Sequence, residues 1–216
     1  MDNNYTHISF VVDRSGSMNN IAEDMSGGLQ SLIDKQKLEP GRCTVSLSQF
    51  DTDYDNFYEM VEIDNVPEYK LVPRGGTALN DAIGRSVNSL GDKLSSLKED
   101  DRPGKVLFVI VTDGYENSSK EFSKAQVKEM IETQTDKYNW QFIFLGAGID
   151  TFSDNFDYGV KNGAKLNVVK SAVGTSNMFE SLNSKFSSYR GMNENDYSRS
   201  VASGAFFDKE DRDKQL

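Results

Sequence analysis

Three short segments carry small oxygen-bearing side chains, and two of them also carry a carboxylate. They are residues 13–18 (Asp-Arg-Ser-Gly-Ser-Met), 75–79 (Gly-Gly-Thr-Ala-Leu) and 112–114 (Thr-Asp-Gly). Two aspartates that converge without a cation repel each other, and a divalent ion removes that conflict. Hydroxyl groups can complete an oxygen shell, and Mg²⁺ accepts six oxygens while keeping waters readily. The candidate ligands are Asp13, Ser15, Ser17, Thr77 and Asp113.

Apolar runs lead directly into two of these segments. Residues 7–12 end at Asp13, residues 106–111 end at Thr112, and a third run, 140–145, ends at a glycine. Short continuous apolar runs of this kind are typical of strands buried on both faces of a parallel sheet. In an open α/β sheet, ligands bind beyond the carboxyl ends of the strands, where the strand order reverses. If the first and fourth strands are neighbours there, the two aspartates meet at one point.

The remaining elements alternate between strands and helices. Residues 44–50 and 57–63 predict two strands paired through residues 51–55, and residues 166–169 predict a last strand. Apolar side chains recur every three or four residues within 21–32, 79–97, 127–131 and 178–189, which predicts four helices, the third capped by Ser123. This order predicts a doubly wound α/β domain with helices on both faces of the sheet.

The three segments together resemble the metal-ion-dependent adhesion site of von Willebrand factor type A (VWA) domains. Residues 13–17 match its Asp-x-Ser-x-Ser motif, Thr77 looks like its separate threonine, and Asp113 looks like its second aspartate. The parts occur in the family's order and at its approximate spacing, and the likeness covers roughly residues 5–190. It is closest to compact bacterial and phage VWA proteins, in which Thr-Asp-Gly-x-Glu-Asn recurs (here residues 112–117).

The resemblance implies a Rossmann-like fold, mostly parallel with one antiparallel edge strand, and a role for each ligand. Ser15 and Ser17 resemble direct hydroxyl ligands, and Thr77 resembles a ligand that is direct or bridged by water. Asp13 and Asp113 resemble the carboxylates that hold the ion directly or through water. The implied ion is Mg²⁺, with Mn²⁺ or Ca²⁺ as alternatives.

The resemblance further implies a protein-interaction module rather than an enzyme. The metal keeps one open face, and a protein partner presents an Asp or Glu side chain that completes its shell. The partner-binding rim is expected at the residues that follow or interrupt the motif: Arg14, Met18, Asn19, Tyr115, Glu116 and Asn117.

Other interpretations stay open for these residues. Taken singly, Ser15, Ser17 and Thr77 suit helix caps, and Asp113 with the next glycine suits a plain turn. Asp81, one helical turn beyond Thr77, is either an acceptor behind the ligands or a solvated residue. For the whole chain, the alternatives are a metal-stabilised structural or self-assembling protein and a Mg²⁺-dependent hydrolase. The hydrolase needs a base or nucleophile near the metal, which the motif does not offer.

Four acidic residues fall at the spacing of an EF-hand calcium loop. They are Asp51, Asp53, Asp55 and Glu62, but Asn56 stands where that loop requires glycine, and the flanking segments predict strands instead of helices. A charged hairpin turn is therefore the favoured interpretation.

Composition narrows the function classes. The net charge of −10 argues against a nucleic-acid partner. One cysteine and one histidine, Cys43 and His7, exclude an internal disulfide and a Cys- or His-rich metal site. The amino-terminal residues show no signal-peptide pattern, and the longest strongly apolar run, 106–111, is too short to span a bilayer. We therefore expect a cytoplasmic protein that is not inserted in a membrane.

The chain is expected to divide at about residue 190. Residues 1–190 form the predicted VWA domain, and residues 191–216 are polar and end in a run of mixed charge. Such a segment is typically a flexible tail, because it has too little apolar surface to offset the entropy of ordering. The alternative is a docking segment that uses Phe206 and Phe207.

Overall fold

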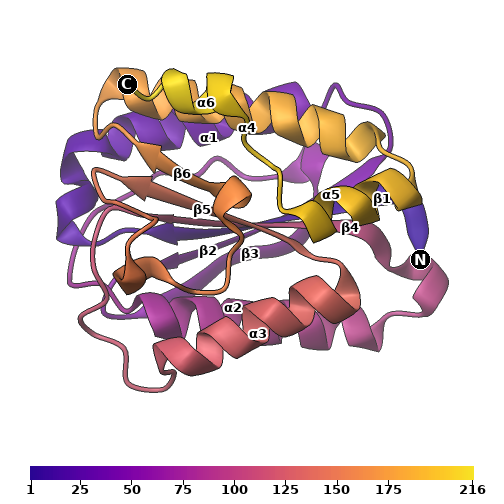
Figure 1. Cartoon of the computed structure of the whole chain (residues 1–216), viewed down its shortest axis with the longest axis horizontal. Helices are drawn as coiled ribbons and strands as arrows, with labels where there is room; N and C mark the ends of the chain where they lie inside the picture. The colour runs from indigo at the N-terminus through magenta and orange to yellow at the C-terminus, as the bar shows by residue number, and fades with distance from the viewer.

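A six-stranded sheet forms the centre of the computed structural model, which describes all of residues 1–216 (Figure 1). The strands are β1 (Asp2–Asp13), β2 (Arg42–Phe50), β3 (Tyr54–Glu62), β4 (Pro103–Thr112), β5 (Gln141–Ala147) and β6 (Lys165–Val168), in the spatial order β3-β2-β1-β4-β5-β6. All neighbours pair in parallel except β2 and β3, which form an antiparallel hairpin at one edge. The predicted mostly parallel sheet with one antiparallel edge strand is confirmed.

The central strands are almost completely buried on both faces, and most of their side chains are apolar. Residues 106–111 of β4 are at most 4% exposed. Because both sides of such a strand meet apolar layers, its sequence is a continuous apolar run without alternation. The apolar runs that led into Asp13 and Thr112 therefore mark the two strands in the middle of the sheet, and β1 and β4 are direct neighbours.

Helices cover both faces of the sheet (Figure 1). α1 (Ala22–Gln36) and α4 (Ala172–Gly191) lie on one face, and α2 (Leu79–Ser96) and α3 (Lys124–Tyr138) lie on the other. α3 begins at the predicted cap, where the Ser123 hydroxyl accepts a hydrogen bond from Gln126 N and the Gln126 side chain accepts one from Ser123 N. The predicted apolar stripe of α2 is buried; it consists of Leu79, Ile83, Val87, Leu90 and Leu94.

α1 and α4 approach each other closely at Gly28. A Cβ at this position would lie 2.1 Å from Cδ2 of Phe179 on α4, so only glycine leaves room for that ring. Glycine inside a helix costs about 1 kcal/mol relative to alanine. The close packing of the Phe179 ring against the backbone of α1 accounts for this glycine in the middle of the helix.

Five short 3-10 helices complete the connections: η1 (Gly16–Ile21), η2 (Ile63–Asn65), η3 (Glu99–Asp101), η4 (Asp154–Phe156) and η5 (Asn162–Ala164). η1 begins inside the first candidate metal-binding segment and leads directly into α1. None of the helices combines the length and the apolar character needed to cross a membrane.

The expectation of a flexible polar tail after residue 190 is wrong. The segment forms α5 (Glu194–Ser203) and α6 (Lys209–Asp213), and its aromatic residues enter the core. Phe206 is 2% exposed, and its ring centroid lies 4.8 Å from that of Tyr189 on α4. The hydroxyl of Tyr197 on α5 donates to Val106 O, at 2.9 Å, and accepts from Val106 N. A few well-placed aromatic rings thus fix a segment whose average composition is polar, and Phe206 and Phe207 are core residues rather than a docking surface.

Candidate metal site

The three candidate segments converge where the strand order reverses. Asp13 is the last residue of β1, and Asp113 directly follows the last residue of β4. The two strands are parallel neighbours although they are far apart in sequence, and Val12 pairs with Val111. The chain builds β2 and β3 on one side of β1 and then crosses to build β4 on the other. This crossover leaves the ends of β1 and β4 next to each other, with the connection before α2 beside them.

Hydrogen bonds join the hydroxyl residues to Asp113. The Ser17 hydroxyl donates to Asp113 Oδ1 at 2.7 Å, and the hydroxyl oxygens of Ser15 and Ser17 are 3.0 Å apart. The Thr77 hydroxyl lies next to Gly114, where an added Cβ would be 3.2 Å from Thr77 Oγ1. Four of the five predicted ligands therefore occupy one small volume.

Asp13 lies next to this group and orients the loop that follows it. Its Oδ1 accepts a hydrogen bond from Ser15 N and its Oδ2 one from the Thr112 hydroxyl, each at 2.6 Å. Burial raises the pKa of Asp13 to about 6; the hydrogen bonds from Thr112 and Ser15 oppose this shift, and the charge of Asp113 adds to it. The carboxylate thus connects the ends of β1 and β4 and adds negative charge beside the hydroxyl groups.

Asp113 has one carboxylate oxygen without a hydrogen bond. Its side chain is buried; Oδ1 accepts from Ser17, whereas Oδ2 has no donor in hydrogen-bond geometry. The ammonium of Lys170 lies 2.6 Å from Oδ2 as an ion-pair partner. This ion pair is the only polar contact of Oδ2, so a buried carboxylate oxygen at this site is matched with a cation.

Backbone hydrogen bonds hold the loop containing Thr77 against the loop after β1. Arg74 N donates to Arg14 O at 2.7 Å, and Gly16 N donates to Gly75 O at 3.2 Å. Gly75 has a φ of +65°, which glycine adopts without strain. These backbone contacts fix the path of the loop that carries Thr77, and thereby the place of its hydroxyl group.

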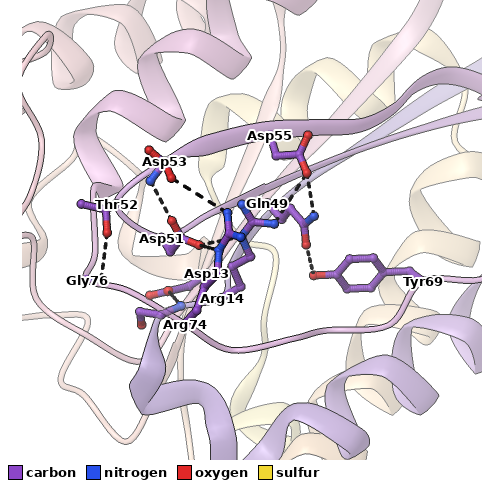
Figure 2. Close-up of polar contacts among 11 residues, drawn as sticks. Asp13, Arg14, Gln49, Asp51, Thr52, Asp53, Asp55, Tyr69, Arg74 and Gly76 are labelled. Atoms are coloured by element: carbon purple, nitrogen blue, oxygen red, sulfur yellow. Dashed lines mark hydrogen bonds and ion pairs between the residues drawn. The ribbon is translucent and has the colours of Figure 1, made fainter.

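Arg14 does not belong to a partner-binding rim, contrary to the prediction. Its side chain is 9% exposed, and its Nε donates to Asp51 Oδ2 at 2.9 Å, beside Arg74 Nε at 2.6 Å from the same oxygen (Figure 2). Asp51 also accepts from Asp53 N through Oδ1. Burial alone would raise the pKa of Asp51, but the hydrogen bonds from Asp53 N and Arg74, together with both guanidinium charges, lower it. Arg14 therefore anchors the first ligand loop to the β2–β3 hairpin.

Three further rim residues also have internal roles. Met18 is fully buried. Glu116 accepts from Asn80 N at the start of α2 and from the backbone of its own loop. Asn117 is exposed, yet its side-chain oxygen accepts from Thr77 N at 2.9 Å. Burial therefore removes Arg14 and Met18 from the predicted rim, whereas Glu116 is partly exposed and Asn117 is exposed while it holds Thr77.

Asn19 and Tyr115 are exposed, as Asn117 is, and neither takes part in holding a ligand loop. Tyr115 is 54% exposed, and its ring lies 5.2 Å from that of Phe156, measured between centroids. Asn19 lies exposed on η1. The surface available for contacts beside the candidate metal site is consequently smaller than the sequence indicated.

Asp81 proves to be neither an acceptor behind the ligands nor a solvated helix residue. Its carboxylate accepts hydrogen bonds from the backbone N–H groups of Lys120, Glu121 and Phe122. Burial alone would raise the pKa of Asp81, but these three hydrogen bonds lower it below its ordinary value. Asp81 therefore fixes the end of the loop that follows β4.

The acidic residues at EF-hand spacing form the predicted hairpin. Phe50 pairs with Tyr54, so the connection is a tight charged turn between antiparallel strands. Asp51 forms ion pairs with Arg14 and Arg74. Asp55 accepts a hydrogen bond from the Gln49 side chain at 2.9 Å, and Glu62 forms an ion pair with Arg42. The side chains point to different partners and do not form one oxygen cage.

The donor set of the candidate site suits a hard divalent cation. It offers hydroxyl oxygens from Ser15, Ser17 and Thr77, and a buried Asp113 oxygen without a hydrogen bond, beside the negative charge of Asp13. No cluster of three or more His, Cys, Asp or Glu side chains suited to a metal is present. Any cation bound here would therefore meet few carboxylates and several neutral oxygens.

Sequence reasoning missed Asp51, Arg74 and Lys170. Asp51 was assigned only to the hairpin, and nothing in its spacing indicates that it pairs with an arginine inside the metal-binding motif. Lys170 follows the last strand and is more than fifty residues from Asp113 in sequence. Its place beside Asp113 depends on the order of β4, β5 and β6, which only the folded sheet displays.

Known structures resemble this chain in fold. No protein-family model and no curated protein sequence matches it. The VWF domain of the type V pili tip protein Mfa5 from Porphyromonas gingivalis aligns with a TM-score of 0.61 and 9% identity, over 87% of this chain and 97% of that one. A von Willebrand factor type A protein from Catenulispora acidiphila aligns with a TM-score of 0.55 and 14% identity, over 83% of this chain and 42% of that one.

A third similar structure is proximal thread matrix protein 1 from the mussel byssus. It aligns with a TM-score of 0.57 and 15% identity, over 85% of this chain and 46% of that one. This chain thus spans less than half the length of the mussel and Catenulispora proteins. At these identities the likeness concerns the fold.

Proposed function

Because the chain has the von Willebrand factor type A fold, we propose that it is a metal-dependent protein-interaction module. One divalent cation, Mg²⁺, is held by Ser15, Ser17, Thr77 and Asp113 next to Asp13. The observation that carries the proposal is the gathering of three hydroxyl groups beside the buried Asp113 carboxylate, whose Oδ2 contacts only a cationic group. One protein of similar fold is a pili tip protein and another is a thread matrix protein of the mussel byssus, which supports a role in binding.

The cation would supply a positive charge at the end of the sheet with one face open to a partner. Because Asp113 is the only carboxylate among the proposed direct ligands and the others are neutral hydroxyl groups, the cation can still attract an Asp or Glu side chain of a protein partner, which completes the shell. The net charge of −10 opposes approach of a strongly acidic surface. The partner therefore presents a single carboxylate among neutral or basic residues, close to Tyr115 and Asn19.

We propose binding rather than catalysis for this site. The only histidine, His7, is buried within β1 and is not among the residues that converge on Asp113. The Ser15 and Ser17 hydroxyl groups hydrogen-bond each other, and Ser17 donates to Asp113. The other nearby carboxylate, Asp13, already accepts hydrogen bonds from Ser15 N and the Thr112 hydroxyl, one on each oxygen. The chemistry on offer is therefore attraction of a carboxylate to a fixed cation.

A thermal unfolding experiment tests the metal. At a Mg²⁺ concentration a thousandfold above the dissociation constant, binding stabilises the native state by about 4 kcal/mol. For a chain of this length the melting temperature rises by about 10 °C. Ser15→Ala and Asp113→Asn should lose most of this rise, whereas Ser95→Ala, a hydroxyl near the far end of α2, should keep it. An equal Mg²⁺ response in all four proteins refutes the proposed site.

A second experiment tests capture of a partner. Proteins from the native host are retained on the immobilised chain with Mg²⁺ and then eluted with a chelator. A true partner should rebind when Mg²⁺ returns and should fail to bind Thr77→Ala, provided that this variant keeps its native circular dichroism spectrum. Retention that is indifferent both to the chelator and to Thr77→Ala would place the binding surface elsewhere.

A further inference from the structure

Lys170 reaches the candidate metal site from the opposite half of the sheet. It lies in the short connection between β6 and α4, and its Nζ is 2.6 Å from Asp113 Oδ2. The Lys170 side chain is 28% exposed, whereas the Asp113 side chain is completely buried. A partly solvated ammonium thus touches the one carboxylate oxygen that has no hydrogen bond.

The path of this side chain depends on Gly148, in the loop after β5. Gly148 has a φ of +72°, and a Cβ there would lie 3.2 Å from Lys170 Cβ and 3.4 Å from its Cδ. Gly148 N also donates to Val168 O at 2.8 Å, which fixes the loop next to the end of β6. The aliphatic part of Lys170 therefore lies along a glycine surface that directs the ammonium toward Asp113.

The contact neutralises a charge that would otherwise be costly. Asp113 has no other cationic partner, and the nearby Asp13 carboxylate adds further negative charge when ionised. A buried carboxylate without a counter-ion is strongly disfavoured. In the absence of a divalent cation, Lys170 therefore supplies the positive charge that this end of the sheet needs.

A divalent cation and the Lys170 ammonium compete for the same oxygen. Both are positively charged, and their repulsion would be strong at the few ångströms that separate neighbouring ligands. The 28% exposure of Lys170 shows that the side chain has access to solvent, so it can move away while its flexible stem remains.

We propose that Lys170 is a tethered counter-ion of Asp113 that a divalent cation must displace. This inference rests on the proposed metal-binding function. The ammonium stabilises the metal-free site and weakens metal affinity. Metal binding frees the ammonium at the edge of the site, so loading changes both the charge and the contacts presented there. The affinity of this site for Mg²⁺ is then set by a residue that is not a ligand.

The test compares Lys170→Met, which keeps an unbranched apolar stem, with Lys98→Met, which removes the same charge before the start of β4, at the opposite end of the sheet. Calorimetric titration of the metal-free proteins with Mg²⁺ should give a dissociation constant about tenfold lower for Lys170→Met. Lys98→Met should stay within twofold of the unchanged protein. In chelator, Lys170→Met should melt at a lower temperature than the unchanged protein, and saturating Mg²⁺ should remove or reverse that difference.

The outcomes separate this inference from the proposed function. If the unchanged protein binds Mg²⁺ and both variants bind it equally well, the counter-ion role is refuted and the metal site stands. If neither the unchanged protein nor Lys170→Met binds Mg²⁺, both proposals fail.

Should Lys170→Met not fold, nuclear magnetic resonance of the lysine ammonium groups in the unchanged protein decides the question. The Lys170 signal, assigned with Lys170→Arg, should change as Mg²⁺ is added and lose the features of an ion-paired ammonium. A signal that stays constant to saturation refutes the displacement.

Discussion

Replacing Asp51 by alanine should destabilise the protein and loosen the candidate metal site together. The Asp51 side chain is 2% exposed and balances Arg14, which is 9% exposed, and Arg74, which is largely solvated. Removing one member of a buried pair costs about 3–5 kcal/mol, because the remaining charge stays buried without a partner. Since Arg74 can turn to solvent and Arg14 keeps Asp55 at 3.6 Å, we expect the lower end, about 3 kcal/mol. For a chain of this size, that corresponds to a melting temperature about 10 °C lower.

The loss should extend to metal binding because of what Asp51 connects. Its carboxylate holds Arg14, which lies between Asp13 and Ser15, and Arg74, in the segment that leads to Thr77. Without Asp51, both ligand loops lose a common anchor. We therefore expect the Mg²⁺-induced rise in melting temperature to shrink in Asp51→Ala, although Asp51 touches none of the candidate ligands.

Urea unfolding followed by circular dichroism measures the stability change, and Asp53→Ala is the control. Asp53 is 80% exposed and contacts Arg74 only at 3.9 Å, so its replacement should change the free energy of unfolding by less than about 0.5 kcal/mol. Arg14→Ala and the double variant Asp51→Ala/Arg14→Ala complete a double-mutant cycle. A coupling free energy near zero between Asp51 and Arg14, or equal effects of Asp51→Ala and Asp53→Ala, would refute the reasoning.

Three further predictions concern other parts of the chain. Burial lowers the pKa of His7 from 6.5 to about 3; between these pH values the unfolded chain holds a proton that the folded chain lacks, so stability falls as pH falls. His7→Leu should reduce that loss by up to about 1.4 kcal/mol per pH unit in urea unfolding. Phe206→Ala should lower the free energy of unfolding by about 3–5 kcal/mol, since its ring is buried. Calorimetry should detect no Ca²⁺ binding that Asp53→Ala/Asp55→Ala removes.

Each of these predictions has a result that contradicts it. Parallel pH profiles for His7→Leu and the unchanged protein would show that His7 does not remain neutral in the folded state. An effect of Phe206→Ala no larger than that of Phe57→Ala, whose residue is 42% exposed, would mean that the last segment is not part of the core. Calcium binding lost in Asp53→Ala/Asp55→Ala and kept in Asp113→Asn would restore the EF-hand interpretation.

The sequence alone predicted the sheet and the order of its elements, because local patterns carry that information. A strand buried on both faces requires a continuous apolar run, as in residues 106–111, and a helix on a sheet requires an apolar stripe, as in α2. The cap at Ser123 and the hairpin after Phe50 also depend on a few neighbouring residues. The metal-ligand predictions came from a motif, and the fold brings those segments together.

Only the tertiary structure decided which polar side chains face solvent and which form hydrogen bonds and ion pairs within the protein. Arg14 and Glu116 follow or interrupt the motif strands, as rim residues would, but their charges are satisfied by Asp51 and by backbone N–H groups. Phe206 lies in a polar segment, yet its ring packs into a core that α4 presents. Burial and charge pairing are sums over neighbours from distant parts of the chain, whereas strand and helix patterns need only local periodicity. For that reason the sequence determined the elements and the motif, and only the folded arrangement determined that Lys170 meets Asp113.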